Sequence, residues 1–307
     1  MRQIFFQKLE EYAKKDKNLF LLVGDLGIKF FENFRKIDPG RAINVGVAEA
    51  NMIGVAAGLS MSGKNVYCYS IIPFLTMRAF EQIRVDICYN NLSVKLLGAG
   101  GGLAYGAEGI THHAIEDIAI MRSLPNMTVV CPGDAKEAEM LAEESVNYPG
   151  PLYIRFGRDF DPLVHEGEID FKIGKGIVVK EGKGVCIITT GTMLHTANNL
   201  LAALEKENIT PTLISMHTVK PLDKELVKKY MQDSKNIFTI EDHNIIGGLG
   251  SAIAEVLAEN SYKGKFKRIG IEDKYCSTCG SANYLLKSHG LDEEGIVKTI
   301  LKEYRND

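Results

Sequence analysis

Short apolar runs alternate with longer stretches of helical spacing along the first half of the chain. Continuous apolar runs of five to eight residues are typical of buried parallel strands, whose two faces are both covered. The pattern predicts strands at 19–26, 65–72, 93–98, 127–132 and 151–156, and helices at 3–15, 47–62, 74–90, 115–123 and 134–147. Strands separated by helices predict a parallel sheet with helices on both faces.

A polar segment at 158–180 interrupts this alternation, which then starts again. The second half predicts strands at 185–190, 212–215, 236–241 and 266–271, and helices at 193–206, 223–231, 248–259, 281–289 and 293–304. We therefore expect an α/β protein of two doubly wound domains, residues 1–160 and 181–307, joined by a linker at 161–180. A chain of 307 residues with 45% hydrophobic content is long enough to form two cores.

Charge and hydropathy narrow the classes of partner. The net charge is −3, from 36 basic and 39 acidic residues that are mixed along the chain, so the sequence lacks the basic stripe that nucleic acid requires. No apolar run reaches about 18 residues, and the first residues do not follow the pattern of a signal peptide. We expect a cytoplasmic protein that binds small molecules or other proteins, without contact to a membrane.

Two local patterns are weak evidence for a metal site and for a nucleotide-binding loop. Cys276 and Cys279 form a CxxC pair, but a structural zinc site needs four ligands and no second pair follows, so we expect no metal here. The glycines from Gly247 to Gly250 follow a strand and open a helix, as in nucleotide-binding loops. Three polar residues separate them from the strand, so we interpret them as a turn that packs on the neighbouring domain.

Glu49 is the single acidic residue in the long run of small and apolar residues from 44 to 59. The pattern places its carboxylate in the first turn of a helix, where the helix dipole tolerates a negative charge. Such a carboxylate can share a proton with a ring nitrogen. Thiamine diphosphate needs this kind of partner, because its aminopyrimidine must gain a proton before the thiazolium carbon becomes a nucleophile. The alternative is a glutamate that only caps the helix.

Three further segments place polar groups among glycines or apolar residues near strand ends. Phe74, Met77 and Phe80 share one face of a predicted helix. The glycine-rich loop at 98–113 ends in two histidines, and irregular loops beyond parallel strands are where α/β proteins bind ligands. Arg155 lies near the end of the predicted strand 151–156, where its guanidinium can bind a phosphate or carboxylate.

The order and spacing of these segments resemble the transketolase family, namely its pyrimidine-binding domain followed by its C-terminal domain. The resemblance rests on Gly24-Asp25-Leu26, Val45-Gly46-Val47-Ala48-Glu49, Gly109-Ile110-Thr111-His112, Glu241-Asp242-His243 and Gly247-Gly248-Leu249-Gly250. It implies a thiamine diphosphate enzyme in which Glu49 activates the cofactor. Phe74, Met77 and Phe80 then belong to the segment that lines the aminopyrimidine pocket.

The resemblance also implies roles toward a sugar substrate. His112 matches the family histidine that contacts the substrate, although it could instead pair with Glu116 or Asp117 at a helix start. Glu108 stands where the family usually has an aspartate. Arg155 matches the arginine that binds the sugar phosphate, and Arg2 matches a second phosphate-binding arginine.

One family motif is missing. In full-length relatives, a preceding domain carries a Gly-Asp-Gly…Asn motif that holds Mg²⁺ and the diphosphate, whereas here Gly24-Asp25 continues with Leu26-Gly27. The chain therefore resembles the C-terminal subunit of a split transketolase. This implies an N-terminal-type partner subunit that holds the Mg²⁺, and an α2β2 heterotetramer that moves a two-carbon ketol unit from a ketose to an aldose.

The substrate is less well defined. The family's phosphate-contacting side chain falls at Gly100 or Gly101, so we expect extra volume beside the anion site. We predict a modified ketose, such as a sulfonate or nucleotide-linked sugar, with Arg155 as the main anion contact, assisted by Arg2 or Lys29. The alternatives are a subunit similar to 1-deoxy-D-xylulose-5-phosphate synthase or to the E1 β chain of 2-oxoacid dehydrogenases, or a binding subunit without catalytic activity.

Overall fold

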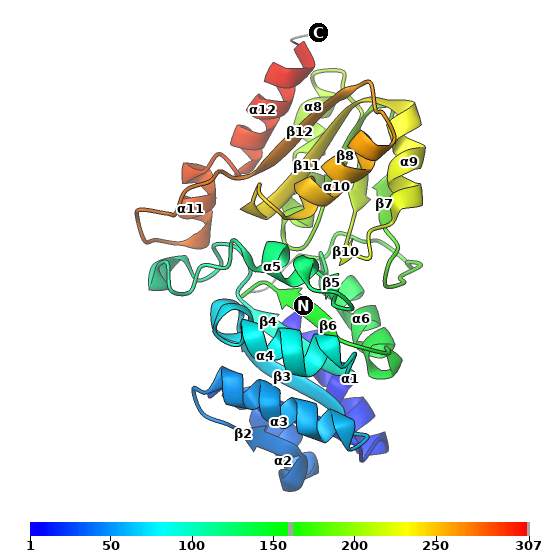
Figure 1. Cartoon of the computed structure of the whole chain (residues 1–307). Helices are drawn as coiled ribbons and strands as arrows, with labels where there is room; N and C mark the ends of the chain where they lie inside the picture. Colours follow the sequence, from blue (N-terminus) through cyan, green and yellow to red (C-terminus); the bar gives the residue numbers. More distant parts are fainter. Residues whose placement is uncertain (159–161, 306–307) are drawn as a thin grey trace.

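The first sheet runs through the lower half of the molecule in Figure 1. The computed structural model describes residues 1–158 and 162–305 of the chain. The strands of this sheet are β1 (Leu19–Val23), β2 (Ala42–Asn44), β3 (Asn65–Ile71), β4 (Val94–Ala99), β5 (Thr128–Val130), β6 (Leu152–Phe156) and β10 (Thr218–Lys220). Their order is β10-β5-β6-β4-β3-β1-β2, and all neighbours are parallel except β10 and β5. The carboxyl ends of β3, β4 and β6 therefore meet at one edge, where the candidate site lies.

Helices cover both faces of this sheet. One face carries α1 (Arg2–Lys15), α2 (Ile28–Ile37) and α6 (Ala135–Asn147), whose apolar residues form one core with β1 and β6. The other face carries α3 (Glu49–Met61), α4 (Phe80–Gln82) and α5 (Asp117–Ser123), together with the π-helical segments η2 (Phe74–Arg78) and η3 (Ile83–Tyr89). Two short 3-10 turns, η1 (Pro39–Arg41) and η4 (Gly106–Glu108), complete this half. These two cores exclude water from both faces of the sheet.

The second sheet lies in the other half of the chain. Its strands are β7 (Ile177–Lys180), β8 (Gly184–Thr189), β9 (Thr212–Ser215), β11 (Ser234–Asn244) and β12 (Lys265–Ile271), in the order β12-β11-β8-β9-β7 with only β7 antiparallel. One face packs on α7 (Met193–Asn199), α8 (Leu201–Glu205), α11 (Ala282–Ser288) and α12 (Glu293–Arg305), and the other on α9 (Lys224–Asp233) and α10 (Leu249–Glu259). The predicted class, two doubly wound α/β domains, is confirmed.

Several short elements were not predicted. The helix α2 and the strands β2 and β7 lie in stretches that carried no clear period. The strand β10 comes from the second half of the chain but pairs with β5 of the first sheet, so the two halves share a sheet edge. The predicted domain boundary at residue 160 falls within 159–161, which lie outside the described residues.

The glycine turn before α10 packs on the first domain, as predicted. A Cβ atom at Gly247 would lie 2.6 Å from that of Ala119 in α5, and the Arg122 side chain donates to the Gly247 carbonyl at 3.3 Å. The buried Glu241 carboxylate accepts from the Leu249 and Gly250 amides and fills the position that a nucleotide phosphate needs. Burial raises the pKa of Glu241 to about 7.

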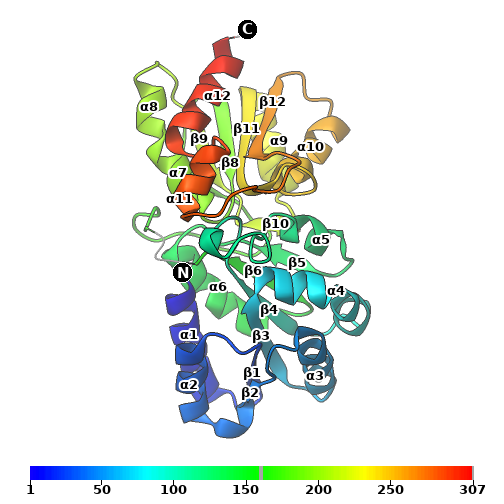
Figure 2. The same ribbon diagram turned by 90° about the vertical axis from the view of Figure 1, so that its left-hand side faces the viewer.

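The junction between the two halves also carries the N-terminus, which both views place at this level (Figures 1 and 2). Arg2, at the start of α1, interacts with Tyr105 of the glycine-rich loop that follows β4. No helix in residues 1–158 and 162–305 is both long and apolar enough to cross a bilayer.

Candidate active site

Glu49 begins α3 directly after the turn that leaves β2, and its side chain is only 1% exposed. The Ser70 hydroxyl at the end of β3 donates to one carboxylate oxygen at 2.8 Å, and Arg78 forms an ion pair with the other at 2.5 Å. Gly24 at the end of β1 keeps room for this group, because a Cβ atom there would lie 3.1 Å from the Glu49 carboxylate. Three parallel strands thus converge on one buried acid.

Arg78 is a site residue that the sequence analysis missed. Its side chain is partly exposed, and its guanidinium lies 4.5 Å from the centre of the Phe74 ring. An arginine in an apolar helical stripe gives no sequence signal of its own. Its guanidinium pairs with a carboxylate that is almost fully buried, although the Arg78 side chain itself is 43% exposed.

The aromatic segment is only partly at the site. Phe74 lies beside Arg78 and packs edge-to-face on His112, with ring centroids 5.1 Å apart. Phe80 packs instead against the core around α3, and Met77 lies on the surface. The segment η2 is π-helical, and its wider turn departs from the predicted period of 3.6 residues, so the place of Met77 and Phe80 at the aminopyrimidine pocket stays a prediction.

His112 lies within the aromatic group, between Phe74 and Tyr105. Its Nδ1 atom is 2.9 Å from the Thr111 hydroxyl, while Asp117, one of the two alternative partners beside Glu116, binds Tyr153 and Arg155 instead. The imidazole is half-buried, so part of it remains accessible from solvent. A histidine so placed can orient a hydroxyl group and exchange a proton with it.

Arg155 is not at the site, which corrects the prediction that it is the main anion contact. Its guanidinium is buried and donates to Asp117 at 2.9 Å and to Asp242 of the second domain at 2.6 Å. Burial in a strand among two carboxylates leaves it no free face. The sequence showed an arginine at a strand end but could not show which way the side chain points.

Arg158, three residues later, takes the exposed position instead. Its guanidinium pairs with Glu108 at 3.1 Å and lies 4.7 Å from the centre of the Tyr105 ring. It also lines a pocket of about 210 Å³ between the two halves of the chain, together with Thr192, His195 and Asn283. The predicted Glu108 is therefore beside the site, paired with an arginine that the sequence analysis did not select.

The glycine run at 100–102 does not leave a void, which corrects a second expectation. A Cβ atom at Gly100 would lie 2.1 Å from the ring of Tyr105, one at Gly101 2.7 Å from the Arg155 guanidinium, and one at Gly102 2.3 Å from the Asp242 carboxylate. The space that a side chain at each glycine would occupy is filled by a side chain from another part of the chain. The glycines are needed for this close approach.

Arg2 lies at the N-terminal end of α1 and donates to the Tyr69 hydroxyl at 3.0 Å. Burial alone would lower its pKa, but the hydroxyls of Tyr69 and Tyr105 raise the pKa of Arg2 overall. Among the described residues, Lys29 makes no contact with Arg2, Tyr69 or Tyr105. Arg2 and Arg158 are thus the arginines that approach Tyr105.

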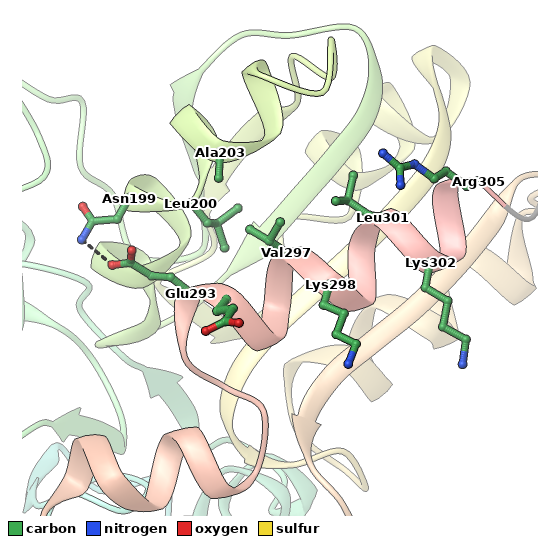
Figure 3. Close-up of a pocket in the computed structure, with 10 residues that line it drawn as sticks. Asn199, Leu200, Ala203, Glu293, Val297, Lys298, Leu301, Lys302 and Arg305 are labelled. Atoms are coloured by element: carbon green, nitrogen blue, oxygen red, sulfur yellow. Dashed lines mark hydrogen bonds between the residues drawn. The ribbon is translucent and has the colours of Figure 1, made fainter.

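Two features lie apart from this cluster. The Cys276 sulfur is within hydrogen-bond distance of His289 Nε2, at 2.9 Å, and a Cβ atom added at Gly109 would lie 3.1 Å from the Cys279 sulfur. No group of three acidic, cysteine or histidine side chains in the described chain could hold a metal ion. A pocket of about 730 Å³ lies between α7, α8 and α12, lined by Leu200, Val297 and Leu301 (Figure 3). It contains none of the predicted site residues.

The chain matches the models of two known protein domains. The model of the transketolase pyrimidine-binding domain matches residues 1–160, and that of the transketolase C-terminal domain matches residues 174–296. The chain belongs to the transketolase family. This is a family of thiamine diphosphate-dependent transferases, so Glu49 and its neighbours lie in a pyrimidine-binding domain by sequence as well as by fold.

The relatives are subunits of split transketolases. The chain is 36% identical to a subunit of the apulose-4-phosphate transketolase of Phocaeicola vulgatus (98% of this chain, 96% of the relative). It is 37% identical to a 6-deoxy-6-sulfo-D-fructose transketolase subunit of Clostridium sp. strain MSTE9 (97% and 92%). A solved structure described as a split gene transketolase, inactive beta4 tetramer, superimposes with a TM-score of 0.88 at 37% identity (98% and 96%).

The synthase alternative is more distant. The 1-deoxy-D-xylulose-5-phosphate synthase of Chlorobium luteolum is 33% identical, and the match covers 99% of this chain but only 48% of the synthase. The split transketolase subunits are matched over nearly their whole length. The predicted assignment to a split transketolase subunit is therefore confirmed, and the synthase is the more distant relative.

Proposed function

We propose that this chain is the subunit of a split transketolase that activates the cofactor and binds the sugar, with Glu49 as the activating acid. One observation carries the proposal: a buried carboxylate at a helix start, held by Ser70 and by Arg78, whose guanidinium lies over the Phe74 ring. A carboxylate in this setting can hold or return a proton at a ring nitrogen. The bound thiamine diphosphate would supply the nucleophilic carbon that cleaves the ketose beside its carbonyl.

The residues present fit the pyrimidine half of the cofactor. Glu49 provides the carboxylate, and the Phe74 ring, which contacts its partner Arg78, provides an apolar group of the same cluster. We assign the diphosphate and Mg²⁺ to an N-terminal-type partner subunit in an α2β2 assembly that acts in the cytoplasm. The sequence supports this assignment, because Gly24-Asp25 is not followed by the glycine and asparagine of the family's metal-binding motif.

The remaining residues act on the substrate. His112 orients the hydroxyl group next to the bond that breaks and moves its proton as it becomes a carbonyl. Arg158 and Arg2 hold an anionic group at the far end of the sugar. We propose a ketose whose far end is modified, because relatives over the full length are described as transketolases of apulose 4-phosphate and 6-deoxy-6-sulfo-D-fructose.

Reconstitution tests the proposal. The chain is mixed with an N-terminal-type transketolase subunit from the same source, thiamine diphosphate, Mg²⁺, a ketose donor and an aldose acceptor. We expect transfer of a two-carbon unit by the mixture only, with each subunit alone inactive, and only weak binding of the cofactor to this chain alone by calorimetry. Turnover or tight Mg²⁺-dependent cofactor binding by this chain alone would contradict the division of labour.

A further inference from the structure

Tyr105 lies at the centre of the candidate substrate residues, and neither the motifs nor the roles above use it. It precedes η4 in the loop after β4, and its ring edge occupies the place where a side chain at Gly100 would begin. Gly100 has a φ angle of +87°, so a larger residue is disfavoured there in any case. The side chain that this position lacks is supplied from five residues downstream.

The contacts of Tyr105 join the residues that we assign to the substrate. Its ring meets His112 edge-to-face, with centroids 5.9 Å apart, and Arg158 lies 4.7 Å from the ring centre. Its hydroxyl is close enough to Arg2 to contribute to the raised pKa of that side chain. One tyrosine thus lies between the histidine near the reacting end and both arginines near the far end.

The side chains around Tyr105 carry an excess of positive charge, which favours a bound anion. The polar side chains that act on the half-buried Arg2 are those of Tyr69 and Tyr105, which offer hydroxyl groups and no carboxylate. Arg158 has a carboxylate partner, Glu108, but both side chains are about one-third exposed and their pair is weak in water. A half-buried guanidinium with only hydroxyl partners favours a bound oxyanion.

We propose that Tyr105 is the specificity-determining residue for the far end of the sugar. Its hydroxyl donates to a terminal tetrahedral oxyanion, either phosphate or sulfonate, that lies between Arg2 and Arg158. Its ring fills the space over Gly100 and so limits the width of the chain that reaches this anion. The inference rests on the proposed function, since it identifies the substrate class of the same site.

Binding of an unreactive sugar alcohol separates this idea from catalysis. Glucitol 6-phosphate lacks a carbonyl, so its binding to the assembled, cofactor-loaded enzyme is measured by calorimetry without turnover. We expect Tyr105→Phe to weaken its binding at least about tenfold, because a hydrogen bond to a charged group is lost while the ring remains. Binding of uncharged glucitol should be unchanged. Equal binding of glucitol 6-phosphate to both proteins would overturn the proposal.

Kinetics identifies the anion. The assembled wild-type and Tyr105→Phe enzymes are compared on fructose 6-phosphate, 6-deoxy-6-sulfofructose and fructose. We expect kcat/KM to fall about tenfold or more for at least one anionic ketose, through KM, with less than a twofold change for fructose. The ketose with the larger fall shows which oxyanion the hydroxyl contacts. A fall of the same size for fructose would show a structural role and overturn the proposal.

Tyr304→Phe is the matched control. Tyr304 lies in α12 near the end of the chain, far from the junction, and is 37% exposed, so this variant should behave as wild type in both measurements. Failure of the wild-type assembly to transfer any two-carbon unit would count against the proposed function instead. The binding experiment would still decide the role of Tyr105 in that case.

Discussion

At the scale of single residues, two arginines near the end of β6 have opposite electrostatic surroundings. Arg155 is buried between Asp117 and Asp242 and holds the two domains together, and those two carboxylates raise its pKa well above the ordinary value although burial alone would lower it. Arg158 pairs with the partly exposed Glu108 beside the cleft. We therefore expect the first to contribute to stability and the second to substrate binding.

Two matched variants separate these roles. Arg155→Met leaves two buried carboxylates without their cation, so we expect the free energy of unfolding to fall by roughly 3–5 kcal/mol in urea denaturation. Arg158→Met removes a partly exposed pair, so we expect a loss below about 1 kcal/mol but a higher KM for an anionic ketose. The assignment is wrong if Arg158→Met is the more destabilised variant or if its KM is unchanged.

At the scale of elements, α6 is tied to the linker and to the second sheet by one buried carboxylate. Glu137 accepts from His165 at 2.7 Å, from Ser215 of β9 at 2.6 Å and from the Gly133 amide at 2.6 Å. Burial disfavours the charged form of each group, but the hydrogen bond and the attraction between them outweigh it. The pKa of His165 is therefore raised and the pKa of Glu137 lowered. The contact therefore stabilises the fold only while the histidine is protonated and the glutamate is ionised.

This ion pair predicts a pH-dependent stability. A histidine with a raised pKa contributes fully below its ordinary value of about 6.5, and the contribution is lost as the pH rises through the value in the folded protein. We expect wild type to exceed His165→Gln in free energy of unfolding most near pH 5.5 and much less near pH 9. Urea denaturation at both pH values measures this, with the partly exposed His195→Gln as control. An equal difference at the two pH values would contradict the ion pair.

The elements also show how far the sequence determines the structure. Continuous apolar runs were enough to place β1, β3, β4 and β6, because a buried parallel strand has no polar face. The segment at 74–90 was predicted as one helix, but π-helical turns in η2 and η3 change its period. Side chains such as Arg155 and Tyr105 could not be oriented from sequence, since the fold and not the local pattern decides what they contact.

At the scale of the whole molecule, the two domains meet where the strands of the first sheet end. The strand β10 extends that sheet from the second half, and the Arg155 ion pairs fix the junction beside the glycine loop. The position of His112, Tyr105 and Arg158 therefore depends on both domains. The sequence predicted Glu49, His112 and Arg2 as members of the site, while their mutual arrangement required the fold.

The central claim is that Glu49 activates the bound cofactor, and the most direct measurement is exchange of the thiazolium C2 proton for deuterium. Wild type and Glu49→Gln are compared in the assembled enzyme without substrate, with Glu81→Gln, an exposed glutamate of the neighbouring helical segment, as control. Because an amide cannot accept and return the proton, we predict exchange at least about a hundredfold slower in Glu49→Gln, with the control unchanged. Exchange within tenfold of wild type would contradict the account.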